Sequence, residues 1–218
     1  MRPPGFSIFV KAMRDIKRID TVILAAGSSS RLGNNKLLLT VDGVPVLKRT
    51  LSHFLALQMG VVFVVTGFDR ERVEGLLRDA PVLTIHNPLY EEGMSASVKA
   101  ALPLLGEADG VFFHLGDKPF VQRETLQAMV DAFGRTRHSI IMPLFQGQKG
   151  HPVLLDVKPY LAEMQVLQGD TALRPVIENH SQDILYVEGD EGITLDLDTD
   201  EDIDRLRRRG YKIEKAEG

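Results

Sequence analysis

Six short apolar runs alternate with segments of helical periodicity, and this alternation restricts the fold of the 218-residue chain more than any other feature. The runs are rich in Val, Ile and Phe and span residues 21–26, 61–67, 82–86, 110–117, 139–145 and 183–188. Between them, residues 47–55 and 126–133 carry apolar stripes at helical spacing. We therefore expect an α/β fold, with a mostly parallel, Rossmann-like sheet covered by helices on both faces in three α/β/α layers.

The alternation weakens after residue 139. The stretch 147–155 is typical of a turn leading into a strand, and 169–180 of a loop entering a short helix. We expect a small antiparallel addition here. Thr199 and Asp202 have the spacing of a capping box, and Gly210 stands where the last helix should end.

Length and composition favour a single domain over residues 20–218, preceded by an extension over residues 1–19 that begins with Pro3-Pro4-Gly5. No apolar run approaches the ~18 residues of a membrane span, and the first residues lack the pattern of a secretory signal, so a cytoplasmic protein without membrane contact is expected. The net charge of -4 disfavours nucleic-acid binding. The absence of cysteine excludes disulfides and thiolate zinc sites.

A polar, basic loop follows the first apolar run, in the stretch VILAAGSSSRLGNNKLLL from Val22 to Leu39. Gly27 and Gly33 lack the third glycine of a dinucleotide fingerprint, and Lys36 is not followed by the Ser or Thr of a P-loop. One interpretation is a solvated serine-rich turn. The other is a backbone nest for an anion, in which Arg31 and Lys36 add two cations suited to a polyphosphate.

Aspartates at the ends of two later segments could hold a divalent cation. Asp117 follows the apolar run 110–115 through Gly116, which is typical of a turn former or of a metal ligand at a strand end. Asp196 and Asp198 are two residues apart and are expected on the same face of a strand, with Asp198 favoured as the second ligand. These carboxylates suit Mg²⁺ completed by phosphate oxygens and water.

The motifs resemble those of one enzyme family. LAAGSSSRLGNNKLLL is similar to the L-A-A-G-x-S-x-R-[ML]-G-x-x-K signature of nucleotidyltransferases related to molybdenum cofactor cytidylyltransferase. Later blocks follow in the family's order: EGMSASVKAAL, LGDKPFV, GQKGHPVLL, GDTALR and DLDTDEDIDRL. The chain departs from the family at Lys118, where glutamine is more usual, and at Asp200, where proline is more usual.

The resemblance implies the nucleotide-diphospho-sugar transferase type of fold and transfer of a nucleotide from CTP to a phosphorylated acceptor, molybdopterin, with release of pyrophosphate. It implies catalytic roles for Arg31, Lys36 and Asp117, and Mg²⁺ bound by Asp117 with Asp198 or Asp196. The implied nucleotide-binding residues are Leu24, Ala25, Ala26, Gly27, Ser28, Arg31, Lys36, Gly93, Ser95 and Ser97. The implied acceptor-binding residues are His151, Gly169, Asp170 and Arg174.

Several alternatives remain open. In the family, Ala25-Ala26-Gly27 resembles the version associated with CTP, whereas a glycine in the middle position is associated with GTP; the methyl of Ala26 is therefore expected to face the base. The acceptor could instead be a sugar phosphate or a terpenoid-precursor phosphate. A non-catalytic nucleotide sensor or cofactor chaperone is a further alternative, and a molybdoenzyme or its chaperone is the expected recipient of the product.

Overall fold

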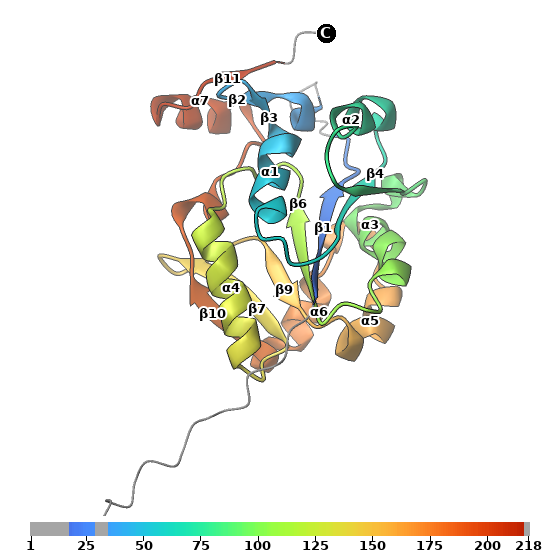
Figure 1. Ribbon diagram of the computed structural model, residues 1–218. Coiled ribbons are helices and arrows are strands. Elements are labelled where there is room, and N and C mark those ends of the chain that lie inside the picture. Colours follow the sequence, from blue (N-terminus) through green and yellow to red (C-terminus); the bar gives the residue numbers. More distant parts are fainter. Residues whose placement is uncertain (1–17, 29–34, 216–218) are drawn as a thin grey trace, which may run out of the picture.

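The computed structural model describes residues 18–28 and 35–215, and its central feature is a sheet in the order β10-β7-β9-β6-β1-β4-β5, with β8 paired to β7 (Figure 1). Strands β1, β4, β5 and β6 are parallel, β10 is parallel to β7, and β9 is antiparallel to both of its neighbours. The strands of this sheet are β1 (Ile19–Ala25), β4 (Val62–Thr66), β5 (Leu83–His86), β6 (Gly110–Leu115), β7 (Ile140–Phe145), β8 (Gln148–Lys149), β9 (Val153–Leu155) and β10 (Ile184–Glu188). The six expected apolar runs thus form β1, β4, β5, β6, β7 and β10, and the antiparallel addition is β8 and β9.

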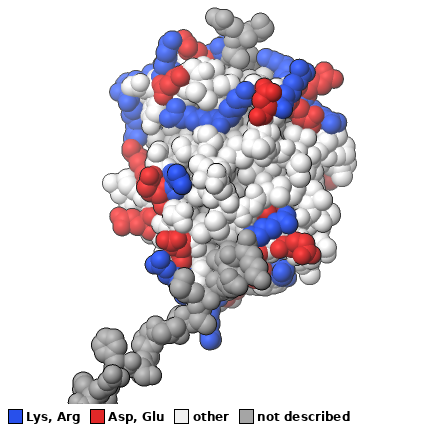
Figure 2. Space-filling model, viewed as in Figure 1, with Lys and Arg blue, Asp and Glu red and all other residues white. Residues whose placement is uncertain are grey.

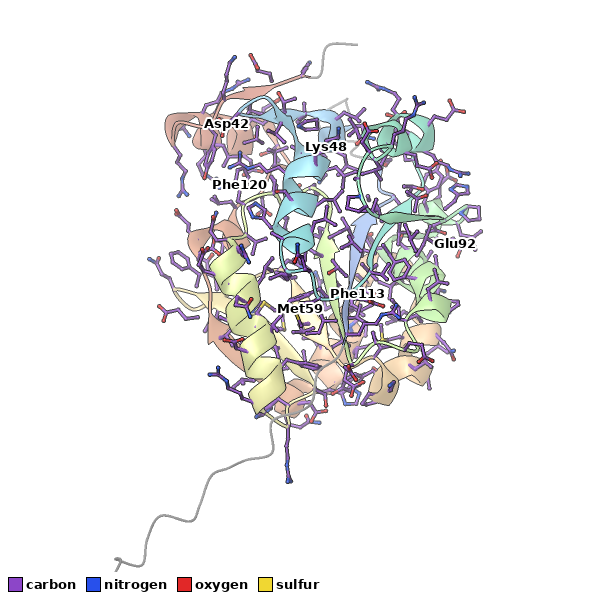
Figure 3. All side chains as sticks on the ribbon, in the orientation of Figure 1. Asp42, Lys48, Met59, Glu92, Phe113 and Phe120 are labelled. Atoms are coloured by element: carbon purple, nitrogen blue, oxygen red, sulfur yellow. The ribbon has the colours of Figure 1, made fainter. Side chains whose placement is uncertain are left out.

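Helices cover both faces of the sheet, as expected from the apolar stripes. One hydrophobic cluster joins α1, α2 and α4 to one face, and a second joins α3, α5 and α6 to the other. The helices are α1 (Val46–Leu55), α2 (Arg70–Leu76), α3 (Met94–Ala101), α4 (Arg123–Arg135), α5 (Leu161–Gln165), α6 (Arg174–Asn179) and α7 (Asp200–Arg208). Figure 3 shows the side chains of α1 and α4 filling the layer against the strands, with Phe113 of β6 labelled within the sheet.

A second, three-stranded sheet stands beyond the carboxyl ends of β1 and β6 (Figure 1). It joins β2 (Thr40–Val41), β3 (Val44–Pro45) and β11 (Ile213–Glu214) in antiparallel pairs, and it shares a third hydrophobic cluster with α7. The capping box of α7 forms, because the Thr199 side chain accepts from the Asp202 backbone N–H and the Asp202 carboxylate accepts from Thr199 N–H.

One expected strand is absent. Glu191–Thr194 is a 3-10 turn, and Leu195–Leu197 pairs with no strand in the described chain. Leu195 and Leu197 are nevertheless buried in the third cluster while Asp196 and Asp198 are partly exposed. The alternation of buried and partly exposed side chains from 195 to 198 thus reflects the packing of an extended segment, not pairing with a neighbouring strand.

β1 begins at Ile19, next to the expected boundary between residues 19 and 20, and the division into an extension and a single domain stays a prediction. Residues 1–17 lie outside the described residues, so the N-terminal extension remains a prediction. Among the described residues no helix has the length and apolar character that a bilayer crossing requires. On the face shown in Figure 2, Lys and Arg side chains lie among Asp and Glu rather than in one basic patch.

Candidate active site

A cavity of about 730 Å³ opens at the carboxyl ends of β1, β4 and β6. Ligands of open α/β sheets bind at this edge because the connecting loops converge there. The cavity is lined by Leu24, Ala25, Ala26, Gly27, Ser28, Lys36, Leu37, Phe68, Tyr90, Glu91, Glu92, Gly93, Met94, Ser97, Leu115, Asp117, Asp170 and Asp198. Eleven of these were expected site residues, and the structure brings together residues as far apart in sequence as Leu24 and Asp198.

One end of the cavity holds Lys36 between two carboxylates. Its ammonium forms ion pairs with Asp117 Oδ2 and, at 2.6 Å, with Asp198 Oδ1. Burial lowers the pKa of Lys36, but the two carboxylates outweigh this effect and the pKa lies above its ordinary value. Lys36 is therefore a cation throughout the neutral range.

Local contacts hold these groups at one end of the sheet. The short turn η1 (Lys36–Leu38) is capped by Asn35, whose side chain accepts from Leu37 N–H at 3.1 Å. The Leu37 side chain lies close to Gly116, which donates its N–H to Leu24 O at 2.9 Å and accepts from Thr50 Oγ1 through its carbonyl. The end of β6 is thus fixed to the end of β1, and Asp117 is presented to Lys36.

The carboxylates at this end fit a divalent metal. Asp117 is 17% exposed, and its Oδ1 is buried without a hydrogen-bond partner among the described residues. An unpaired buried carboxylate oxygen is costly unless a cation or donor completes it. The described chain contains no group of three or more His, Asp or Glu suited to a metal, so Asp117 and Asp198 would need phosphate oxygens and water, as Mg²⁺ allows.

Asp196 lies in a different environment from Asp198. Its Oδ1 is ion-paired with the ammonium of Lys118, and it is not among the residues that line the cavity. Lys118 is the residue that departs from the family pattern. It follows Asp117 directly in the sequence, but its ammonium is paired with Asp196. The arrangement favours Asp198 over Asp196 as the partner of Asp117.

The other end of the cavity lies where β4 and β5 end, on the opposite side of β1 from β6 and Asp117; it is aromatic and acidic, and it was largely missed from the sequence. Phe68 follows β4, is 38% exposed and packs edge-on against Tyr90 with ring centroids 6.4 Å apart. Phe68 N–H donates to Ala26 O at 3.1 Å, which fixes this wall against the first loop. Glu91 and Glu92 follow Tyr90 in the turn η2 (Tyr90–Glu92), and Figure 3 shows Glu92 at the outer edge of the fold. Exposed aromatic faces in a cavity suit a planar ring.

The start of α3 packs against the turn η5 (Gly169–Thr171), and Gly93, Ser95 and Asp170 lie at this contact. A Cβ on Gly93 would lie 2.5 Å from the backbone of Gly169, so only glycine allows this approach. Asp170 Oδ1 accepts from Met94 N–H at 3.1 Å and thereby satisfies the backbone N–H of the first residue of α3. Ser95 is fully buried and donates to Gln168 O, so its hydroxyl faces the interior rather than the cavity.

Ser97 and Ala26 line the cavity from buried positions. Ser97 Oγ accepts from Asn87 Nδ2 at 3.0 Å, and both side chains are buried. Ala26 is only 3% exposed, and its methyl lies against Gly67, because a Cβ on Gly67 would be 2.8 Å from it. The methyl therefore packs against Gly67, and because Ala26 also lines the cavity, the expectation that its methyl faces the base stays a prediction.

Three expected acceptor residues, His151, Gly169 and Arg174, do not line the cavity. His151 instead packs edge-on against His114, with ring centroids 6.3 Å apart. Arg174 is exposed at the first residue of α6. Arg31, expected in the triphosphate site, lies outside the described residues, so its role remains a prediction.

His114 should make the stability of the protein depend on pH. It is 1% exposed, and its Nε2 donates to Lys118 O at 2.9 Å. Burial and the neighbouring His151 lower the pKa of His114 to about 3, whereas the unfolded chain binds this proton near 6.5. We expect the free energy of unfolding to fall as the pH drops below 6.5, by up to ~1.4 kcal/mol per pH unit for this group.

Chemical denaturation at several pH values between about 7 and about 5 measures this slope. His114→Gln keeps an N–H donor that does not titrate, so it should reduce the dependence of the free energy of unfolding on pH. His86→Gln replaces an exposed histidine and should not reduce it. Burial and Lys118 likewise lower the pKa of His151, to about 4, so the slope should become smaller rather than vanish. An unchanged slope in His114→Gln would contradict the assignment.

Comparison with known proteins gives a consistent result. The family model described as a MobA-like NTP transferase domain matches residues 21–184. The molybdenum cofactor cytidylyltransferase of Escherichia coli K12 is 31% identical over 202 residues, which cover 89% of this chain and 98% of that protein. The crystal structure of Rv0371c from Mycobacterium tuberculosis H37Rv superposes with a TM-score of 0.76 at 27% identity, covering 88% of this chain and 99% of that one. The complex of the same protein with manganese gives 0.72 at 26% identity, covering 87% and 97%.

Proposed function

Because the chain belongs to the family of MobA-like NTP transferase domains and is a nucleotidyltransferase, we propose that it transfers a cytidylyl group from CTP to the phosphate of molybdopterin, in a Mg²⁺-dependent reaction that releases pyrophosphate. The observation that carries the proposal is the two-ended cavity, with Lys36, Asp117 and Asp198 at one end and Phe68 and Tyr90 at the other. This division suits a nucleoside triphosphate, whose charge and planar base lie at opposite ends. We also propose a cytoplasmic location.

In the proposed mechanism, Asp117 and Asp198 would hold Mg²⁺, which when bound would supply positive charge that neutralises the phosphate oxygens. Lys36 donates to the triphosphate, and Arg31 does the same from the first loop, so charge that develops on the departing pyrophosphate meets cations. The acceptor phosphate is already ionised near neutral pH, and its oxygen displaces pyrophosphate without a dedicated general base. No Ser-His-Asp set is required.

The acidic residues on the cavity lining support an amino-bearing nucleobase. Glu91, Glu92 and Asp170 line the cavity, and no Lys or Arg other than Lys36 does so among the described residues. Carboxylates only accept hydrogen bonds, so they favour the 4-amino group of cytosine over the 4-carbonyl of uracil. Guanine and adenine also carry amino groups, so GTP and ATP remain competing nucleotides.

The deciding experiment measures pyrophosphate release from CTP, GTP, UTP and ATP, each with molybdopterin, a sugar phosphate and a terpenoid-precursor phosphate as acceptors. We expect turnover with CTP and molybdopterin to exceed every other pair. Faster turnover with GTP, or with either of the other acceptors, would replace the corresponding part of the proposal. Binding of nucleotide without turnover on any acceptor would support a chaperone instead.

Phe68→Ala should weaken nucleotide binding about 10-fold, because stacking on an aromatic face contributes roughly 1–3 kcal/mol per base. The residue is exposed, so the fold should be unaffected. Titration with a non-hydrolysable CTP analogue measures the effect, and Phe68→Leu separates loss of the ring face from loss of apolar area. The control is Leu89→Ala, an exposed apolar neighbour outside the cavity lining. Equal weakening in the control would contradict a stacking role.

A further inference from the structure

The position of Lys36 raises a conflict between two tasks. Its ammonium is paired with Asp117 Oδ2 and Asp198 Oδ1, the carboxylates that also fit a divalent cation. A divalent cation on Asp117 Oδ2 and Asp198 Oδ1 would lie at contact distance from the ammonium, and like charges repel strongly in a partly buried site. Lys36 is also the only Lys or Arg on the cavity lining among the described residues, so it is the described cation available to a triphosphate.

We propose that Lys36 competes with the divalent metal for Asp117 and Asp198 in the nucleotide-free protein, and that it exchanges these carboxylates for phosphate oxygens when nucleotide binds. The proposal rests on the assignment of this cavity to a metal-bound nucleotide. A lysine suits the exchange, because its charge is a compact ammonium on a flexible four-carbon stem. The side chain is 19% exposed, so one side of it faces the opening.

Pairing with Lys36 engages only one of the two carboxylate oxygens of Asp117. Oδ2 contacts the ammonium, whereas Oδ1 is buried and has no partner in the described chain. A single ammonium therefore satisfies this carboxylate only in part. A divalent cation carries twice the charge, and it should bind these carboxylates more tightly once phosphate oxygens draw Lys36 away.

The competition predicts coupled binding of metal and nucleotide. Metal alone must displace Lys36 without offering its ammonium another anion, so it should bind weakly. Metal with nucleotide provides that anion, and the two should strengthen each other by the same factor. Removing the ammonium should therefore strengthen metal binding in the absence of nucleotide and reduce the coupling.

The test measures Mn²⁺ binding by electron paramagnetic resonance, without acceptor and without turnover. Lys36→Met should bind Mn²⁺ at least about 10-fold more tightly than the unmodified protein. Lys36→Arg keeps the charge and should stay weak. Lys48→Met removes an exposed lysine of α1, labelled in Figure 3, and should leave Mn²⁺ binding unchanged. Adding Asp117→Asn to Lys36→Met should abolish the gain, which places it at this carboxylate.

A second titration with a non-hydrolysable CTP analogue compares the Mn²⁺ affinities with and without nucleotide. Their ratio should be smaller in Lys36→Met than in the unmodified protein. Mn²⁺ affinity that does not rise in Lys36→Met, or that rises equally in Lys48→Met, overturns the competition but leaves nucleotidyl transfer standing. Conversely, absence of transfer from CTP to molybdopterin with the Mn²⁺ result intact overturns the proposed reaction alone.

Discussion

Asp117→Asn is expected to lower nucleotidyl transfer at least ~100-fold, about 2.7 kcal/mol in the barrier, and to leave the fold intact. The amide keeps the size of the carboxylate but removes the charge that pairs with Lys36 and that we assign to the metal. The loss should appear in kcat, because the interaction strengthens as charge develops on the departing pyrophosphate.

Steady-state pyrophosphate release at several Mg²⁺ concentrations measures this loss, and circular dichroism checks the fold. Asp79→Asn is a matched control, because it replaces an exposed aspartate beyond α2 that does not line the cavity. A folded Asp117→Asn variant with no more than a twofold loss would remove Asp117 from the metal site. Recovery of full activity at high Mg²⁺ would instead indicate that Asp117 affects only metal affinity.

The strands and main helices were predictable because their signal is local. Residues 47–55 and 126–133 bury one stripe against the sheet, and α1 and α4 follow that stripe almost residue for residue. The position of the cavity was also predictable, since Gly27 and Asp117 follow two apolar runs, and parallel strands bring such ends to one edge. These inferences need no knowledge of which side chains meet.

The alternating segment 195–198 misled the strand prediction because burial alternates there without a pairing strand. Leu195 and Leu197 pack against α7 and the small sheet, and an extended segment that packs this way shows the same period as a strand. Periodicity reports which side chains are buried, not which backbone groups are paired. A paired strand would have needed a neighbour that the sequence does not reveal.

The roles within the site depended on contacts between distant segments. Ser95 and Ser97 occupy the same helix two positions apart, yet Ser95 donates to Gln168 O while Ser97 lines the cavity. Phe68 had no motif to mark it, since an aromatic residue after an apolar run is equally typical of a core position. Its exposure beside Tyr90 becomes apparent only when the loops after β4 and β5 converge.

The pair Asp198→Asn and Asp196→Asn should separate the two candidates for the second metal ligand. We expect a loss of at least about 30-fold for Asp198→Asn and less than about 5-fold for Asp196→Asn, because a ligand lost from a metal costs several kcal/mol whereas an exposed ion pair contributes about 1 kcal/mol or less. Asp198 lines the cavity and shares Lys36 with Asp117, while Asp196 is paired with Lys118 outside the lining.

The two variants make the same chemical change two residues apart, so each is the control for the other. Pyrophosphate release gives the rates, and Mn²⁺ binding in the presence of nucleotide shows whether the loss follows the metal. Equal losses would mean that both aspartates reach the metal, and a larger loss in Asp196→Asn would reverse the assignment. In that case Lys118 would have to leave Asp196 when metal binds. Lys118, which departs from the family pattern, would then control access of the metal to Asp196 instead of keeping that carboxylate away from the metal.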